Sequence, residues 1–164
     1  MGVALISDNS SFVISGIEIK NRSWSNTTGL IQGVTTITSS NEAKKDFNGF
    51  QNTQSIAEYT HASAAYECTV TQFKNGQMGY LASVGEWMEI INNLDEINRC
   101  MSLIDGLDID EGATSYWTST QYNYEKAWLV TYNGNEFYPN DERKGVSFYA
   151  IRAVSYTHLR AHET

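Results

Sequence analysis

The chain of 164 residues is short of basic residues, proline, cysteine and long apolar runs, and these shortages exclude several classes of protein. Its 11 Lys and Arg stand against 19 Asp and Glu, which gives a formal net charge of −8. This balance argues against binding to nucleic acid or to anionic membrane surfaces. No apolar run reaches the length that crosses a bilayer, so we expect no membrane insertion.

The N-terminus lacks the features of a signal peptide. Residues 1–10 have neither a basic start nor a long apolar core, and both are needed in such a segment. The chain begins directly in a strand-like run, so we expect it to be a module of a longer protein.

Cysteine and histidine are too few to suggest a disulfide framework or a metal site. Cys68 and Cys100 lie in helix-like sequence without a C-x-x-C spacing, and we expect both to be buried or half-buried free thiols. Two of the three histidines, His158 and His162, lie in the C-terminal tail, which leaves only His61 in a polar context. We expect no cofactor and no histidine-based metal or catalytic cluster.

An acidic cluster raises the question of calcium. It comprises Asp105, Asp108, Asp110 and Glu111. An EF-hand loop needs acidic ligands at its first, third and fifth positions and a Glu at its twelfth. Counted from Asp108, the fifth position is Gly112 and the twelfth is Ser119, so the spacing favours a solvated acidic loop.

The last residues need separate treatment. Residues 154–164 read VSYTHLRAHET, which resembles the translation of a common sequencing-library adapter. We therefore expect a single domain over residues 1–154 and a non-native tail over residues 155–164.

Local patterns predict strands at both ends and helices in the middle. Two β-branched runs, 3–6 and 11–19, indicate a hairpin, and residues 21–40 are expected to be mostly loop. A capping box at Ser83 and Glu86 predicts a helix start. Further helices are expected over 41–47, 52–59 and 63–71 and from Asp95 to a stop at Gly106, with Ile97, Met101, Leu103 and Ile104 on or near the buried face.

The C-terminal third is the most informative segment. Ten of the chain's 20 aromatic residues lie between Tyr116 and Tyr149. Strands are expected over 115–120, 127–132, 136–138 and 148–154, with Asn133-Gly134 as a hairpin turn and with Trp117, Trp128, Leu129 and Ile151 in the core. Arg152 lies within an apolar strand, so we expect it to be paired by structural hydrogen bonds.

These elements together predict the fold class. Strands, then helices, then strands favour an α+β fold with a mainly antiparallel sheet, in which the N- and C-terminal strands pair and two or three helices lie in the middle.

Several motifs occur in an order that resembles a known family. They are GVALI and SFVI near the start, GYLASVGE at residues 79–86, NRCMSLIDG at 98–106, then YWTST, AW, NG and IRAV between residues 116 and 154. This order resembles the C-type-lectin-like fold of the variable proteins of diversity-generating retroelements and of related bacterial or phage surface adhesin domains. Ala82 stands where that family usually has proline.

The resemblance implies ligand binding through exposed positions of the last third. The matching positions are Tyr122, Asn123, Tyr124, Glu125, Lys126, Tyr132, Glu136, Tyr138, Asn140, Asp141, Glu142, Arg143 and Lys144. Tyrosine offers a large contact area with a polar tip at low entropic cost, although the charged residues fit a solvated face equally well.

The resemblance further implies a non-enzymatic recognition domain on a virion tail or a bacterial surface, with a protein or glycan receptor as partner. The alternative is a structural or assembly module of a larger surface fibre. An enzyme is not expected, because no Ser-His-Asp set, P-loop or dinucleotide fingerprint is present. Formylglycine-generating enzymes, which have a related fold, need reactive cysteines in the C-terminal part, and this chain has none after Cys100.

Overall fold

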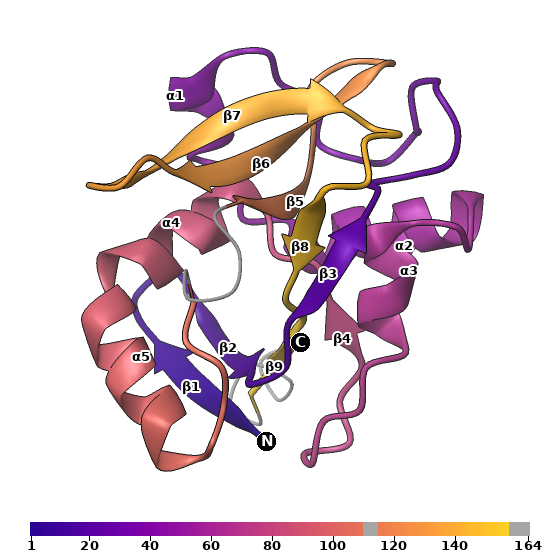
Figure 1. The fold of residues 1–164 in the computed structure, drawn as a ribbon. Coiled ribbons are helices and arrows are strands. Elements are labelled where there is room, and N and C mark those ends of the chain that lie inside the picture. Colours follow the sequence, from indigo (N-terminus) through magenta and orange to yellow (C-terminus); the bar gives the residue numbers. More distant parts are fainter. Residues whose placement is uncertain (110–114, 158–164) are drawn as a thin grey trace.

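The computed structural model describes residues 1–109 and 115–157, which form two sheets flanked by helices (Figure 1). The four-stranded sheet has the order β1-β2-β9-β4 and the five-stranded sheet the order β3-β8-β5-β6-β7. Their bounds are β1 Gly2–Ile6, β2 Ser11–Ser15, β3 Ile19–Arg22, β4 Gly79–Tyr80, β5 Ser115–Gln121, β6 Lys126–Tyr132, β7 Phe137–Arg143, β8 Tyr149–Ile151 and β9 Val154–Tyr156. All strand pairs are antiparallel except β5 with β8.

The helices lie at the two sides of the sheets. In Figure 1, α4 and α5 lie on one side and α2 and α3 on the other. The helix bounds are α1 Ser40–Ala43, α2 Gly49–Tyr59, α3 Ala64–Thr69, α4 Val84–Asn92 and α5 Leu94–Leu103. The predicted α+β class is confirmed, but the described residues form two sheets and five helices instead of one sheet and two or three helices. No helix among the described residues is long and apolar enough to cross a membrane.

The strands near the two chain ends pair, as predicted. β2 lies between β1 and β9, with Ile14 opposite Val154 and Phe12 opposite Tyr156. β9 extends beyond residue 154, where we expected the domain to end. Ser155 is fully buried, and the Tyr156 ring lies 5.0 Å from that of Phe50. Residues 155–157 therefore contribute to the core of the four-stranded sheet.

The capping box predicted at Ser83 is present and also connects two helices. The Glu86 carboxylate accepts the backbone N–H of Ser83 at 3.0 Å and that of Gly49, at the start of α2, at 3.1 Å. Burial raises the pKa of Glu86 to about 7, with a smaller contribution from the nearby Asp46 carboxylate. The role of Glu86 is thus structural, as its sequence spacing indicated.

The end of α5 differs in detail from the prediction. Ile97 and Met101 are buried, but Leu103 is 75% exposed, because a position two residues after Met101 lies on nearly the opposite face of the helix. Asp105 has a positive φ of 56°, and the N–H of Gly106 then bonds to the Met101 carbonyl at 2.9 Å. This is the left-handed helix stop for which a glycine is usual, shifted by one residue.

Arg152 is paired inside the protein, which confirms the structural role predicted for it. Its guanidinium lies 3.0 Å from the Glu18 carboxylate, and both side chains are fully buried. It also donates to the carbonyls of Leu107 and Ser15, at 2.7 and 3.1 Å. One buried arginine therefore connects the end of β2, the segment after α5 and the start of β9.

Candidate functional site

Most of the predicted contact residues lie on the β6–β7 hairpin. The strands pair over seven residues each, from Lys126 opposite Arg143 to Tyr132 opposite Phe137. At the closed end, here called the turn end (residues 133–136), Gly134 has φ of 100°, which confirms the predicted turn. β7 runs well past the expected 136–138, and Pro139 is tolerated within it because β7 is an edge strand.

Strand alternation divides the predicted contact residues between two faces. Tyr138, Asn140 and Glu142 share one face of β7, while Asp141 and Arg143 lie on the other. The predicted contact residues of β7 therefore do not form a single surface.

The hairpin is fixed to the domain by the predicted core residues. Trp117, Trp128, Leu129 and Ile151 are all buried. The indole N–H of Trp117 donates to the Arg22 carbonyl at 2.8 Å, and that of Trp128 to the Ile37 carbonyl at 2.7 Å. Each large ring is therefore satisfied at its polar atom, and the strands that carry the exposed residues are held in place.

The other end of the hairpin, here called the open end (residues 122–126 and 142–146), consists mainly of residues with partners. The Asn123 side chain accepts the backbone N–H of Lys126 at 2.8 Å and closes the β5–β6 turn. The Lys126 ammonium lies 3.0 Å from the Asp141 carboxylate, a contact that raises the pKa of Lys126. The Tyr122 ring packs 5.2 Å from that of Trp128. These predicted contact residues thus stabilise the hairpin itself.

Lys144 is buried, although it was predicted at an exposed position. Only 1% of it is accessible. Its ammonium donates to the Gln121 side chain at 2.6 Å and to the Gly29 carbonyl at 2.8 Å, and lies 4.9 Å from the Trp24 ring. Burial lowers the pKa of Lys144 to about 8. The loop around residue 29 covers the side chain and shields it from solvent.

Glu142 is also engaged within the domain. Its carboxylate accepts the Tyr149 hydroxyl at 2.9 Å. Burial, together with this bond to a carboxylate, raises the pKa of Tyr149 to about 12. The bond ties β7 to β8 outside the backbone ladder.

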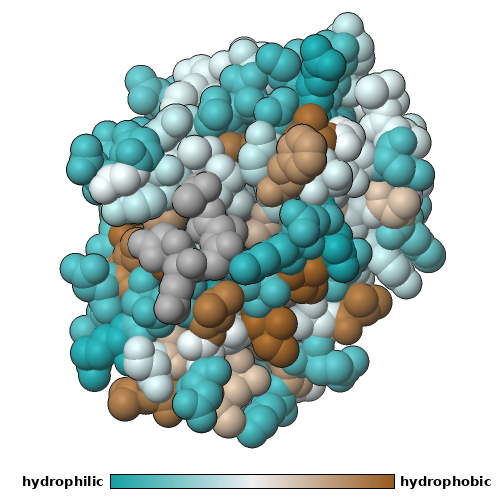
Figure 2. All heavy atoms as spheres, viewed as in Figure 1, coloured by the Kyte–Doolittle hydropathy of each residue, from teal (hydrophilic) through white to brown (hydrophobic). Residues whose placement is uncertain are grey.

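A smaller set of predicted residues remains accessible. Tyr124 is 57% and Tyr138 38% exposed. The others in this set are Glu125, Glu136, Asn140 and Arg143. On the face shown in Figure 2, hydrophilic and neutral residues predominate in the upper part, where Figure 1 places β7, and more of the apolar atoms lie in the lower half.

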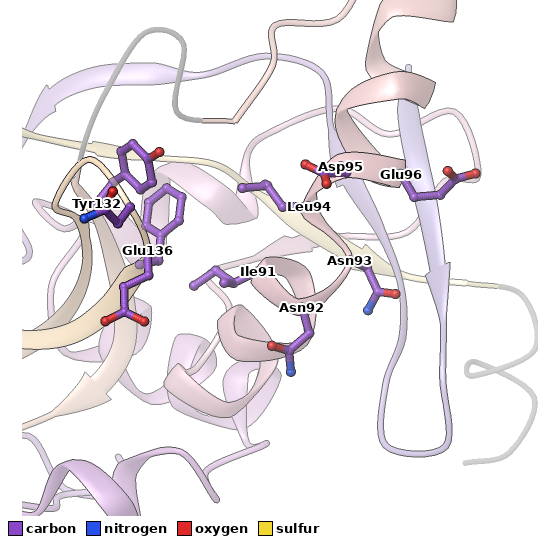
Figure 3. A pocket seen from close by; sticks show the side chains of 10 residues that line it. Ile91, Asn92, Asn93, Leu94, Asp95, Glu96, Tyr132 and Glu136 are labelled. Atoms are coloured by element: carbon purple, nitrogen blue, oxygen red, sulfur yellow. The ribbon is translucent and has the colours of Figure 1, made fainter.

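A pocket of about 540 Å³ lies at the turn end, between the hairpin and the α4–α5 junction (Figure 3). We call it the hairpin-end pocket. Its lining comprises Ile91, Asn92, Asn93, Leu94, Asp95, Glu96, Tyr132, Asn135, Glu136 and Phe137. Only Tyr132 and Glu136 had been predicted as contact residues. The sequence offers no local signal for the rest, because the pocket forms only when two segments about forty residues apart in the chain pack together.

Only half of the acidic cluster considered for calcium binding lies in the described residues. Asp105 and Asp108 are described, whereas Asp110 and Glu111 lie outside the described residues. Within residues 1–109 and 115–157, no group of three or more His, Cys, Asp or Glu is placed to hold a metal ion. Cys68 and Cys100 are free, buried and half-buried respectively, which confirms that prediction.

Comparison with known proteins gives one structural likeness. No family model and no curated protein matches the chain. A crystal structure of a fimbrial protein from Bacteroides ovatus ATCC 8483 is similar, with a TM-score of 0.63 and 18% identity. The match covers 90% of this chain but only 36% of that one, so the chain corresponds to about a third of the fimbrial protein. The α+β fold described above is thus shared with part of a bacterial fimbrial protein.

Proposed function

We propose that this chain is a non-enzymatic module of a bacterial surface appendage, with a structural or assembly role. The observation that supports it most is the likeness of nearly the whole chain to about a third of a fimbrial protein. A module that repeats or combines within a longer subunit would produce such partial coverage of the larger chain.

The interior is consistent with a role other than catalysis. Asp46 and Glu86 are buried acids, and catalytic acids often have such environments. Here the Asp46 carboxylate accepts from Thr120 at 2.7 Å and from Asn52 at 3.1 Å. Glu86 accepts backbone N–H groups at two helix starts. Both carboxylates therefore have structural partners that account for their burial.

The proposal is tested by locating the protein in the organism that encodes it. An antibody raised against residues 1–157 should label fibres sheared from intact cells, and protease added to intact cells should destroy the antigen. A cytoplasmic marker protein in the same cells serves as the protected control. Antigen that remains inside the cells and survives the protease would contradict the proposal.

Receptor recognition through the hairpin is a second candidate function. It is favoured by the exposure of Tyr124 and Tyr138 on a hairpin anchored by buried tryptophans. Rigid, exposed tyrosines are typical of protein and glycan contact surfaces. The double change Tyr124→Ala and Tyr138→Ala should abolish binding to a glycan array or a panel of cell-surface proteins. The matched control is Ile17→Ala, which removes a side chain 66% exposed elsewhere.

The resemblance to retroelement variable proteins gives this second candidate a separate test. In the surrounding DNA, it predicts a reverse transcriptase gene and a repeat copy of the segment that encodes residues 116–154. A phage tail origin would similarly place the gene among virion genes. A genomic neighbourhood of fimbrial genes without either feature favours the assembly module.

A further inference from the structure

The hairpin-end pocket combines an apolar floor with an acidic rim. In Figure 3, the side chains of Ile91 and Leu94 point across the pocket toward Tyr132. Phe137, which is 5% exposed, lies with its ring 4.9 Å from that of Tyr132. The floor is therefore built from two aliphatic and two aromatic side chains of the α4–α5 junction and the hairpin.

Of the three carboxylates on the rim, only Glu96 has an ion-pair partner in the described part of the chain. Asp95, Glu96 and Glu136 line the pocket, and none of its described lining residues is Lys, Arg or His. Glu96 pairs with Arg99 at 2.6 Å and points away from the pocket in Figure 3. In the described part of the chain, Asp95 and Glu136 have no ion-pair partner. Asp95 lies on the wall formed by the α4–α5 junction, and Glu136 lies on the wall formed by the hairpin.

We propose that the hairpin-end pocket receives a lysine side chain of a partner protein. The aliphatic stem would lie on the floor, as lysine stems do on apolar surfaces. The ammonium would lie at the pocket mouth near the ring of Tyr132, where the charges of Asp95 and Glu136 attract it from opposite walls. The volume of about 540 Å³ lies in the range of roughly 300–1,000 Å³ usual for ligand pockets.

The charge distribution decides against other ligand classes. An anionic group would be repelled by the carboxylates and would find no cation among the lining residues. A neutral saccharide could stack on Tyr132 and bond to Asn92 or Asn135, but it would gain nothing from the charge of the two unpaired acids. A lysine uses both the apolar floor and the rim. The proposal deepens the proposed function, because it gives the chemistry by which a neighbouring subunit would dock.

The test uses N-acetyl-lysine methylamide as the probe and the neutral N-acetyl-norleucine methylamide as its matched control. Binding of each probe to the whole chain is measured by the shifts of its backbone amide signals in NMR spectra. The lysine probe should shift residues 91–96 and 132–137 with millimolar affinity, and the norleucine probe should bind about tenfold more weakly. Higher salt should weaken only the lysine probe, because the contribution of the ammonium is electrostatic.

Variants localise the effect. Glu136→Gln and Asp95→Asn should each weaken lysine binding about fivefold, the size of an exposed ion pair at the upper end of its range. Glu58→Gln makes the same change of net charge at an exposed site outside the pocket and should leave binding unchanged.

Three results would overturn the proposal, and the first needs no variant to fold. The first is that the two probes bind equally well. The second is that Glu58→Gln weakens binding of the lysine probe as much as Glu136→Gln does. The third is that methyl glucoside shifts the NMR signals of the pocket residues while the lysine probe does not, which would indicate a saccharide site. Each result leaves the cellular location of the protein, and with it the proposed function, to be judged separately.

Discussion

At the open end of the β6–β7 hairpin several charged side chains have partners within the protein, although Tyr124, Glu125 and Arg143 stay exposed, whereas at the turn end Glu136 faces solvent beside a pocket. Lys126 pairs with Asp141, Glu142 accepts from Tyr149, and Lys144 is buried against Gln121. At the turn end, Glu136 is exposed and has no ion-pair partner in the described part of the chain.

The difference teaches that residue type alone does not separate a contact surface from a scaffold. Both ends contain Asn, and a Tyr lies in the open end and next to the turn end; these residue types are typical of recognition surfaces. What distinguishes them is whether a segment distant in sequence covers the side chain. Substitutions can test this comparison. The loss of unfolding free energy should be large where the side chain is buried or bonded within the protein, and small where it is exposed.

The largest effect is expected at the tryptophan that anchors the hairpin. Trp128→Ala should lower the free energy of unfolding by ~3–5 kcal/mol, because it leaves a large cavity and an unbonded Ile37 carbonyl. Tyr138→Ala, on the exposed side of the same hairpin, should change it by less than ~0.5 kcal/mol. Urea unfolding followed by circular dichroism measures both. Equal losses would show that Tyr138 is part of the scaffold.

The buried Lys144 should make stability depend on pH. The unfolded chain keeps this proton up to the ordinary pKa of 10.5, whereas the folded chain releases it near pH 8. The unfolded state therefore binds more protons between these values, and the free energy of unfolding should rise with pH by on the order of 3 kcal/mol. Below pH 8 both states hold the proton, and the slope vanishes.

Two controls isolate this group. Lys144→Met cannot titrate, so its unfolding free energy should lack the rise above pH 8. Tyr149, whose pKa is raised to about 12, lowers stability only above the ordinary tyrosine value of 10.0, and measurements below that pH avoid it. If the unfolding free energy of the wild-type protein changes with pH as that of Lys144→Met does, the pKa of Lys144 is not lowered by burial in the folded chain.

The scaffold was largely predictable from sequence, because its signals are local. The capping box at Ser83 and Glu86 depends on two residues three positions apart. Trp117 and Trp128 lie in strand-like runs, and rings of their size are rarely left in solvent between apolar neighbours. Asn133-Gly134 specifies a turn by backbone conformation alone.

The candidate site was less predictable, because its features depend on contacts between distant segments. Lys144 is covered by a loop 115 positions earlier in the chain, where it bonds to Gly29. The hairpin-end pocket needs the α4–α5 junction to pack beside the turn end. Neither contact leaves a periodic or local pattern, so Lys144 was grouped with the surface residues and Asp95 was interpreted only as the start of a helix.

A smaller effect should separate two glutamates of the same hairpin. Glu142→Ala removes the acceptor of the Tyr149 hydroxyl and should cost ~1–2 kcal/mol of unfolding free energy. Glu136→Ala removes an exposed carboxylate that has no ion-pair partner in the described part of the chain, and it should change stability by less than ~0.5 kcal/mol. Thermal unfolding at one pH compares them directly. A loss at Glu136 as large as that at Glu142 would mean that the turn end is scaffold as well.

The smallest effect concerns the ion pair between Lys126 and Asp141, whose side chains are 38% and 30% exposed. A double-mutant cycle with Lys126→Met and Asp141→Asn should give a coupling energy of ~0.2–1 kcal/mol, because water and salt screen such a pair. The coupling should fall further when the salt concentration is raised. A pair this weak holds its two side chains in position without contributing much to stability, so a partner protein could separate them at little cost. A coupling well above that range would instead place Lys126 and Asp141 with Trp128 in the scaffold, and the accessible contact surface of the hairpin would then begin at Tyr138.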